Sequence, residues 1–252
     1  HNRIKFVSIH QKDIIWMIWE VILYESKKNK PIHKIIKSLL HIFCFEYTPG
    51  IKRKRKYIIY FAISLLTQPV DNKCKSKYNH DYKRGDILNS ILFHPSTFTH
   101  ITCLYFTIYY VEDKLNAFKN FYDWLKPGGY LIVNLVNRNK FDPIVSAGDP
   151  LLMVSPQKYA KKRITNTVVK FNNFQYKSNF ELDKSNNRAY FKENFKHDKD
   201  GKVRKNEHIL YMNTQKHILG LAKSVGFILK GRIDMVQCMY EYQYLYILYK
   251  PM

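Results

Sequence analysis

The segment Phe98–Val133, FTHITCLYFTIYYVEDKLNAFKNFYDWLKPGGYLIV, constrains the fold of this chain most strongly. It contains a largely apolar run, Ile101–Phe106, which is typical of a strand covered on both faces. Pro127-Gly128-Gly129 then ends a predicted helix, and Tyr130–Val133 begins a second strand. The apolar face of that helix comprises Ala117, Phe118, Phe121, Tyr122, Trp124 and Leu125. Strand, helix and strand at this length predict a βαβ unit, and therefore an α/β domain with a largely parallel sheet.

The chain changes character after Val133. Residues Asn134–Val154 contain turn-forming pairs, and they predict an irregular loop across the edge of the sheet. Four alternating segments with polar turns between them follow, and they predict an antiparallel meander inserted at about residues 155–213. The predicted strands are Ile164–Phe171, Phe174–Leu182, Ala189–Phe195 and Val203–Met212.

The order of these motifs resembles class I S-adenosylmethionine-dependent methyltransferases, in a form that is similar to the small-molecule and uncharacterised enzymes of large DNA viruses. The matching segments are Phe98–Lys114 and Phe121–Val133 for the fourth strand, its helix and the fifth strand, Asp81–Leu88 for the third-strand region, Ala222–Phe227 for the Gly-Phe before the sixth strand, and Tyr242–Pro251 for the seventh strand. The resemblance covers roughly residues 72–252. It implies a Rossmann-like methyltransferase sheet that ends in an antiparallel strand and carries the inserted meander.

The resemblance also implies an activity and a cofactor. The activity would be methyl transfer from S-adenosylmethionine to an unknown, small-molecule acceptor. By motif position, Asp86 would accept a hydrogen bond from the adenine amino group, with Ile87 packed near the ring. Cys103, Leu104 and Tyr105 would line the cofactor at the carboxyl edge of the sheet, where ligands sit in open α/β sheets.

Two further residues are predicted to serve the acceptor. Tyr110 follows Tyr109 after the fourth strand, where the family places aromatic rings that face the acceptor. Such a ring could hold an amine acceptor by cation–π contact, or it could simply pack in the core. His208 lies on the predicted meander, and it resembles a histidine that related enzymes direct toward the acceptor. An imidazole can remove a proton at neutral pH, although a structural role is the alternative. The meander itself would form a lid over the acceptor, or else a sheet for stability or dimerisation.

One feature of the family is not recognisable in this chain. The glycine-rich loop after the first strand lets the backbone approach the cofactor, yet only Gly50 precedes Gly85. Residues 1–71 are rich in Ile, Lys, Tyr and Phe and form a divergent, basic segment. One hypothesis is a frame disruption upstream of Asn72 in a fragment of a methyltransferase, and the other is a diverged region with a fold of its own. A catalytically inactive binding or scaffold module is therefore an alternative function.

The net charge of +22 and the isoelectric point near 9.7 favour attraction to polyanions. The densest basic run is Lys52–Lys56, which fits contact with nucleic acid or a solvated segment. An RNA-associated basic protein is thus a third hypothesis.

Membrane and metal sites are not predicted. The apolar runs Ile14–Tyr24 and Tyr57–Leu66 are shorter than the roughly 20 residues that span a bilayer. The cysteines stand alone in the sequence, at Cys44, Cys74, Cys103 and Cys238, without a C-x-x-C pair. This spacing argues against a zinc site and fits a reducing, cytoplasmic compartment.

Overall fold

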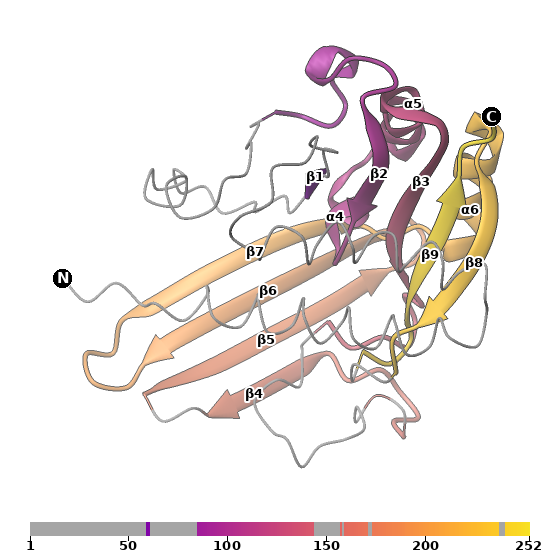
Figure 1. Cartoon of the computed structure of the whole chain (residues 1–252). Coiled ribbons are helices and arrows are strands. Elements are labelled where there is room, and N and C mark those ends of the chain that lie inside the picture. The colour runs from indigo at the N-terminus through magenta and orange to yellow at the C-terminus, as the bar shows by residue number, and fades with distance from the viewer. Residues whose placement is uncertain (1–58, 61–84, 144–156, 158, 171–172, 237–239) are drawn as a thin grey trace, which may run out of the picture.

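The structure is a computed structural model that describes residues 59–60, 85–143, 157, 159–170, 173–236 and 240–252. These residues form a five-stranded sheet of order β1-β2-β3-β9-β8 and a four-stranded sheet of order β4-β5-β6-β7 (Figure 1). The run Ile14–Tyr24, the basic run Lys52–Lys56 and three of the four cysteines lie outside the described residues. No helix among the described residues is long and apolar enough to cross a membrane.

The five-stranded sheet combines parallel and antiparallel pairs. β1 (Ile59–Tyr60), β2 (Phe98–Cys103) and β3 (Leu125–Val136) run parallel to one another. β9 (Gln243–Tyr249) pairs antiparallel with β3 and with β8 (Ile228–Asp234). This arrangement confirms the predicted α/β sheet, in which the last strand of the chain, β9, runs antiparallel to its neighbours.

Strand β2 begins and ends earlier than the apolar run Ile101–Phe106 predicts. After Cys103 the chain turns at Tyr105, whose φ is +54°, and enters the one-turn helix α4 (Thr107–Tyr110). Leu104 and Phe106 accept backbone hydrogen bonds within this turn. Leu104-Tyr105-Phe106 are apolar because they are partly buried at the end of the sheet, and not because they continue the strand.

Strand β3 begins directly after helix α5 (Lys114–Trp124), so Pro127-Gly128-Gly129 lies inside the strand and does not precede it. The pairing with β2 shifts between Phe98 and His100, which accommodates the extra residues as an irregularity. Glycine suits this stretch because Gly128 has a φ of +76°, and a Cβ on Gly129 would lie 3.0 Å from the Thr99 carbonyl oxygen. Asn134–Val136 also belong to the strand, and not to the loop predicted there.

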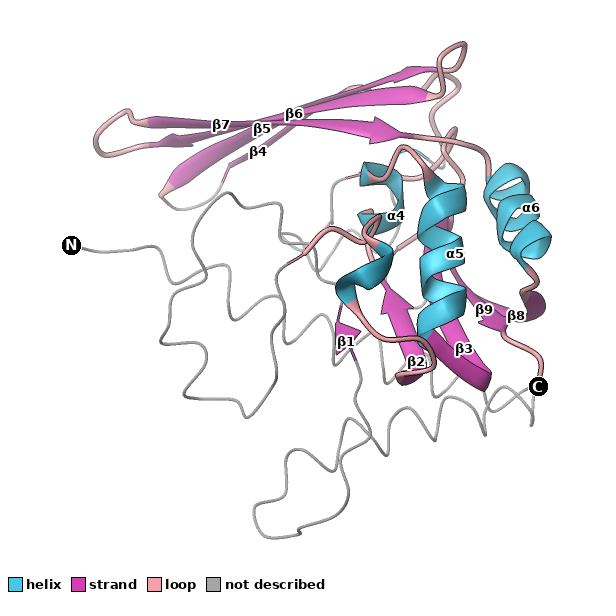
Figure 2. Cartoon of the chain, turned by 90° about the horizontal axis from the view of Figure 1, so that it is seen from above, coloured by secondary structure: helices cyan, strands magenta, loops and turns pink. Residues whose placement is uncertain are grey.

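Helix α5 holds the segment before β2 in place through polar side chains. Asn116, Asn120 and Trp124, spaced four residues apart, donate to the carbonyls of Leu88, Ile87 and Ser90, respectively. These bonds fix the turn at residues 86–89 and the short 3₁₀ helix η1 (Ser90–Leu92) that follows it. α5 and α6 (Gln215–Val225) lie side by side on one face of the sheet (Figure 2).

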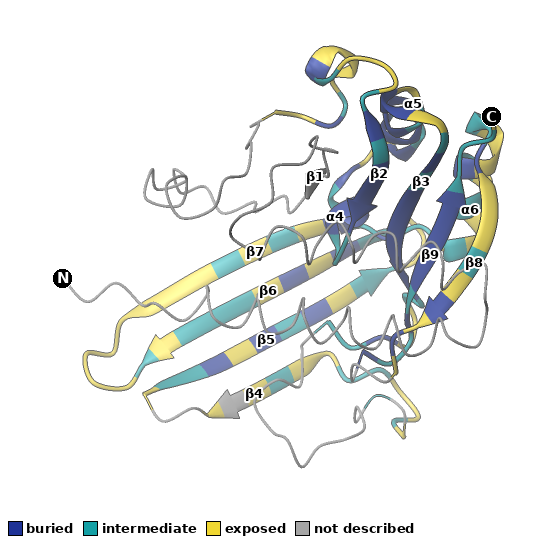
Figure 3. Cartoon of the chain, in the orientation of Figure 1, coloured by how far each residue is buried: buried dark blue, intermediate teal, exposed yellow. Residues whose placement is uncertain are grey.

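The four-stranded sheet confirms the predicted meander. Its strands are β4 (Asn166–Lys170), β5 (Phe174–Asp183), β6 (Arg188–His197) and β7 (Val203–Tyr211), all paired antiparallel. Buried and exposed residues alternate along β5 and β6, so one face points to the core (Figure 3). We call β4–β7 the insertion sheet.

The insertion sheet shares one core with the rest of the fold. Phe180, Phe191 and Leu210 belong to the same buried cluster as Ile101 and Leu131 of the five-stranded sheet. The inner face of the insertion sheet therefore packs on the same domain that carries β2, β3 and α4.

Candidate functional site

The candidate site lies where strands β1 and β2 end. The two strands are parallel neighbours, with Ile59 opposite Ile101. Ligands in open α/β sheets bind at the carboxyl ends of such strands. The residues that follow β1 lie outside the described residues until Gly85, and they contain no glycine.

Tyr105 marks this edge with a strained backbone. Its φ of +54° lies in the left-handed region, which is uncommon for an aromatic residue and costs roughly 1–3 kcal/mol. Such residues concentrate at functional sites, where the fold holds them in place. Leu104 and Tyr105 are half-buried, so they remain within reach of a ligand at the end of β2.

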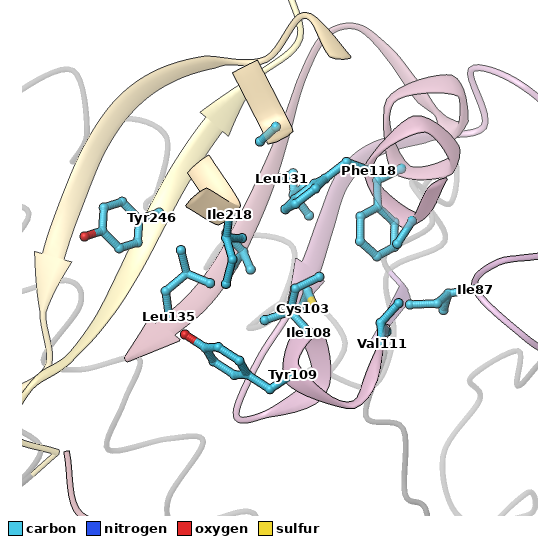
Figure 4. Packing of buried hydrophobic residues seen from close by; sticks show 14 of the residues in the cluster. Ile87, Cys103, Ile108, Tyr109, Val111, Phe118, Leu131, Leu135, Ile218 and Tyr246 are labelled. Carbon is cyan, nitrogen blue, oxygen red and sulfur yellow. The ribbon is translucent and has the colours of Figure 1, made fainter. Parts of the chain in front are cut away.

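Cys103 occupies a different environment from its two neighbours. Its side chain is fully buried among core residues (Figure 4), and burial raises the pKa of the thiol to about 12. The thiol is therefore protonated at neutral pH and behaves as a small core side chain. Any contact of Cys103 with a cofactor would use its backbone.

Asp86 lies in an exposed turn just before η1. Its Oδ1 accepts a hydrogen bond from the Leu88 amide at 2.9 Å, and its carbonyl accepts one from Asn89. Among the described residues Oδ2 has no partner, so this oxygen has the chemistry needed to accept from an adenine amino group. The Ile87 side chain is 2% exposed and lies beside Val111 in the core (Figure 4), which leaves its backbone to contact a ligand.

The two tyrosines of α4 have separate surroundings. Tyr109 is fully buried, and its hydroxyl accepts a hydrogen bond from the Val136 amide at 2.9 Å. Tyr109 is therefore a core residue that ties α4 to the end of β3. Tyr110 points to the insertion sheet, where its hydroxyl lies 3.0 Å from Nδ1 of His208. The structure thus brings together the two predicted catalytic residues, which are 98 positions apart in the sequence.

A carboxylate completes this contact on the far side of the imidazole. Nε2 of His208 lies 3.2 Å from Oε2 of Glu193. Tyr176 donates to Oε1 of Glu193 at 2.7 Å, and Asn206 donates to Oε2 at 3.3 Å. We call Tyr110, His208 and Glu193 the Tyr–His–Glu chain.

The protonation of this chain follows from its surroundings. Burial works to raise the pKa of Glu193, but the hydrogen bonds from His208, Tyr176 and Asn206 hold it below the usual value, so the carboxyl is ionised at neutral pH. Burial, together with the charge of Glu193, raises the pKa of Tyr110 to about 12. The Tyr110 hydroxyl is therefore a proton donor at neutral pH.

A series of aromatic rings leads from the core to the Tyr–His–Glu chain. The ring contacts run from Phe106 to Phe141, Phe180, Phe191, His208 and Tyr110, with centroids 5.3–6.2 Å apart. Arg163 lies over the rings of Phe141 and Phe180 at 5.0 and 4.4 Å. The side chains of His208 and Glu193 are 24% and 17% exposed, so solvent still reaches them. We call the six rings the aromatic cluster.

Sequence reasoning missed Glu193, Tyr176 and Asn206. A lone carboxylate in an alternating strand is usually a solvated charge, and only the pairing of Glu193 opposite Asn206 reveals its inward position. The pairing register was the missing signal.

Comparisons with known proteins bear on this geometry. Residues 50–133 match a family model described as a methyltransferase domain. An S-adenosylmethionine-dependent methyltransferase from Clostridium acetobutylicum has a TM-score of 0.53 and 17% identity, over 72% of this chain and 69% of that chain. The methyltransferase CcbJ from Streptomyces caelestis has a TM-score of 0.49 and 11% identity, over 67% of this chain and 62% of that chain. No curated protein sequence matches this chain significantly.

This chain has the fold of class I methyltransferases. The family match supports S-adenosylmethionine as the cofactor, and it begins at residue 50, ahead of the sequence motifs of residues 72–252. Among the described residues, Asp86 presents a carboxylate oxygen whose chemistry fits the adenine amino group of that cofactor.

Proposed function

We propose that this chain transfers a methyl group from S-adenosylmethionine to a small acceptor that carries an N–H or O–H group. The observation that carries the proposal is the 3.0 Å contact between Tyr110 and His208, which joins helix α4 to the insertion sheet. A proton-accepting group beside the end of β2 is what methyl transfer to a protonated nucleophile requires.

Separate sets of residues would contact the cofactor and the acceptor. When bound, S-adenosylmethionine supplies an electrophilic methyl group on a sulfonium sulfur. Asp86 would hold the adenine amino group, and the backbone of Leu104 and Tyr105 would line the cofactor. Tyr110 and His208 together would take up the proton that the acceptor loses. Positioning supplies much of the catalysis in such a displacement, so a well-ordered acceptor site matters.

Two measurements test the proposal in sequence. Calorimetric titration of the chain with S-adenosylmethionine and with S-adenosylhomocysteine tests the cofactor. Formation of S-adenosylhomocysteine with a panel of small amines and hydroxy compounds then tests transfer. Cofactor binding with no turnover across the panel would favour a binding module, and no cofactor binding by a folded chain would contradict the proposal.

Replacement of Asp86 by asparagine is expected to weaken S-adenosylmethionine binding by about 10- to 100-fold, because a hydrogen bond to a charged group contributes roughly 1.5–3 kcal/mol. Asparagine keeps an oxygen for the Leu88 amide, so the turn is retained. Calorimetry measures the change in affinity.

Asp183→Asn is the matched control, because Asp183 caps a turn of the insertion sheet in the same way through the Ser185 amide. An unchanged affinity in the Asp86 variant would remove this residue from the cofactor site.

A second candidate function rests on the outer face of the insertion sheet. Exposed lysines follow one another across its strands on the face opposite to His208: Lys170, Lys177, Lys192, Lys196 and Lys205. Glu181, Asp183 and Glu207 are the acidic residues of that face in the described strands. Such a surface suits the phosphates of RNA.

Replacing Lys177, Lys192 and Lys205 together by glutamine is expected to lower the salt dependence of single-stranded RNA binding. The slope of log affinity against log salt should fall by about 2, since each lost phosphate contact contributes about 0.7. Fluorescence titrations at several salt concentrations measure it. The control replaces three exposed helix lysines, Lys119, Lys216 and Lys223; an equal fall there would show a charge effect without a site.

A further inference from the structure

We infer that Glu193 is a positioning residue that fixes the tautomer of His208, and that Tyr110 is the group that meets the acceptor. The inference rests on the proposed methyl transfer and assigns the order of the proton path within it.

The contacts of His208 define the tautomer. The ionised Glu193 has no proton to donate, so Nε2 of His208 must carry the hydrogen in their 3.2 Å contact. In the neutral imidazole Nδ1 is then an acceptor, and it receives the hydrogen of the Tyr110 hydroxyl at 3.0 Å. Both ring nitrogens are thereby occupied, so an acceptor reaches the imidazole only through Tyr110.

Glu193 is held firmly enough to act in this way. Tyr176 and Asn206 donate to its two oxygens, and both lie on the same face of the insertion sheet as Glu193. Ser178 and Asn206 stand opposite Glu193 on the neighbouring strands, which fixes its backbone. The Phe191 ring lies 5.8 Å from the imidazole and nearly parallel to it, so the ring plane is set as well.

The proton path follows from this order. As the acceptor attacks, its proton passes to the Tyr110 oxygen while the Tyr110 proton passes to Nδ1 of His208. Tyr110 is neutral before and after the step, which suits a hydroxyl that burial keeps protonated. The positive charge formed on the imidazole is balanced by Glu193 on its other side.

The tautomer can be measured without cofactor or acceptor. Nitrogen-15 NMR of the neutral imidazole, assigned by loss of the signal in His208→Asn, should show the Nε2–H form in the wild-type chain. Glu193→Met keeps the volume but removes the acceptor, and it should give a mixture of tautomers. A wild-type Nδ1–H form, or an unchanged tautomer in Glu193→Met, would overturn the inference.

Kinetics supply the second readout. Glu193→Met is expected to lower kcat/KM by at least about tenfold, because a misoriented histidine loses much of its catalytic power. Glu193→Gln keeps an acceptor for Nε2–H, so it should keep the Nε2–H tautomer that Glu193→Met loses. Tyr110→Phe should keep the tautomer yet lower kcat, which separates positioning from contact with the acceptor; an unchanged kcat would overturn the role of Tyr110.

Glu207→Gln is the matched control, because Glu207 precedes His208 and faces the opposite side of the sheet. It should leave the tautomer and the kinetics unchanged. If no acceptor is turned over and the tautomer still depends on Glu193, the orienting role stands while the proposed function fails.

Discussion

Replacement of His208 by asparagine is expected to lower kcat by about 10²- to 10⁴-fold, the usual contribution of a general base. Asparagine places a carbonyl oxygen near the position of Nδ1, so the Tyr110 hydroxyl can keep a hydrogen-bond partner. The amide cannot take up a proton at neutral pH, so the proton path ends at Tyr110. Steady-state rates of S-adenosylhomocysteine formation measure the loss.

The control for His208 is a second histidine of the insertion sheet. His197 is the last residue of β6, and its Nδ1 lies 2.9 Å from Oδ1 of Asp200. His197→Asn should retain the wild-type rate. A His208→Asn variant with unchanged kcat and unchanged cofactor affinity would mean that the acceptor loses its proton to solvent, and it would remove His208 from the catalytic machinery.

Truncation of Phe118 to alanine is expected to lower the free energy of unfolding by roughly 3–5 kcal/mol. Phe118 is fully buried on α5, where its ring meets Phe121 and Phe227 edge-on at 6.3 and 6.4 Å. The substitution removes these contacts and leaves a cavity between the helix and the sheet. Because domains of this kind are stable by only about 5–15 kcal/mol, the loss is a large fraction of the total.

Denaturant titration followed by circular dichroism measures this change, and Phe118→Leu serves as the milder variant. Ile91→Ala is the control, since Ile91 is 84% exposed and its loss should stay within about 0.5 kcal/mol. A cost below about 1 kcal/mol for Phe118→Ala would contradict the packing of α5 on the sheet.

The sequence predicts the elements with strong periodicity and clear turns. The meander was predictable because polar turns separate segments of regular alternation. The start of β3 was not predictable. Pro127-Gly128-Gly129 usually indicates the end of a helix, whereas here it lies inside an irregular strand. Local signals cannot distinguish these outcomes, because the pairing with β2 decides between them.

The residues of the candidate site were likewise predicted only in part. Tyr110 and His208 were predicted from their motif positions, and the structure places them in contact. Ile87 and Cys103 were expected to face the cofactor, yet their side chains lie in the core. A motif gives the position of a residue along the chain, whereas the side on which its side chain lies depends on packing against segments far away in the sequence.

The aromatic cluster determines how molecules enter and leave. Phe180 and Phe191 are buried in the core that also holds Phe141, so raising the insertion sheet as a rigid flap would expose several rings at about 1.5–3 kcal/mol each. We therefore expect acceptor and product to exchange past the partly exposed edge at His208, through rotamer changes of a few side chains. Turnover would then be gated on the timescale of side-chain rotation, without a slow hinge motion.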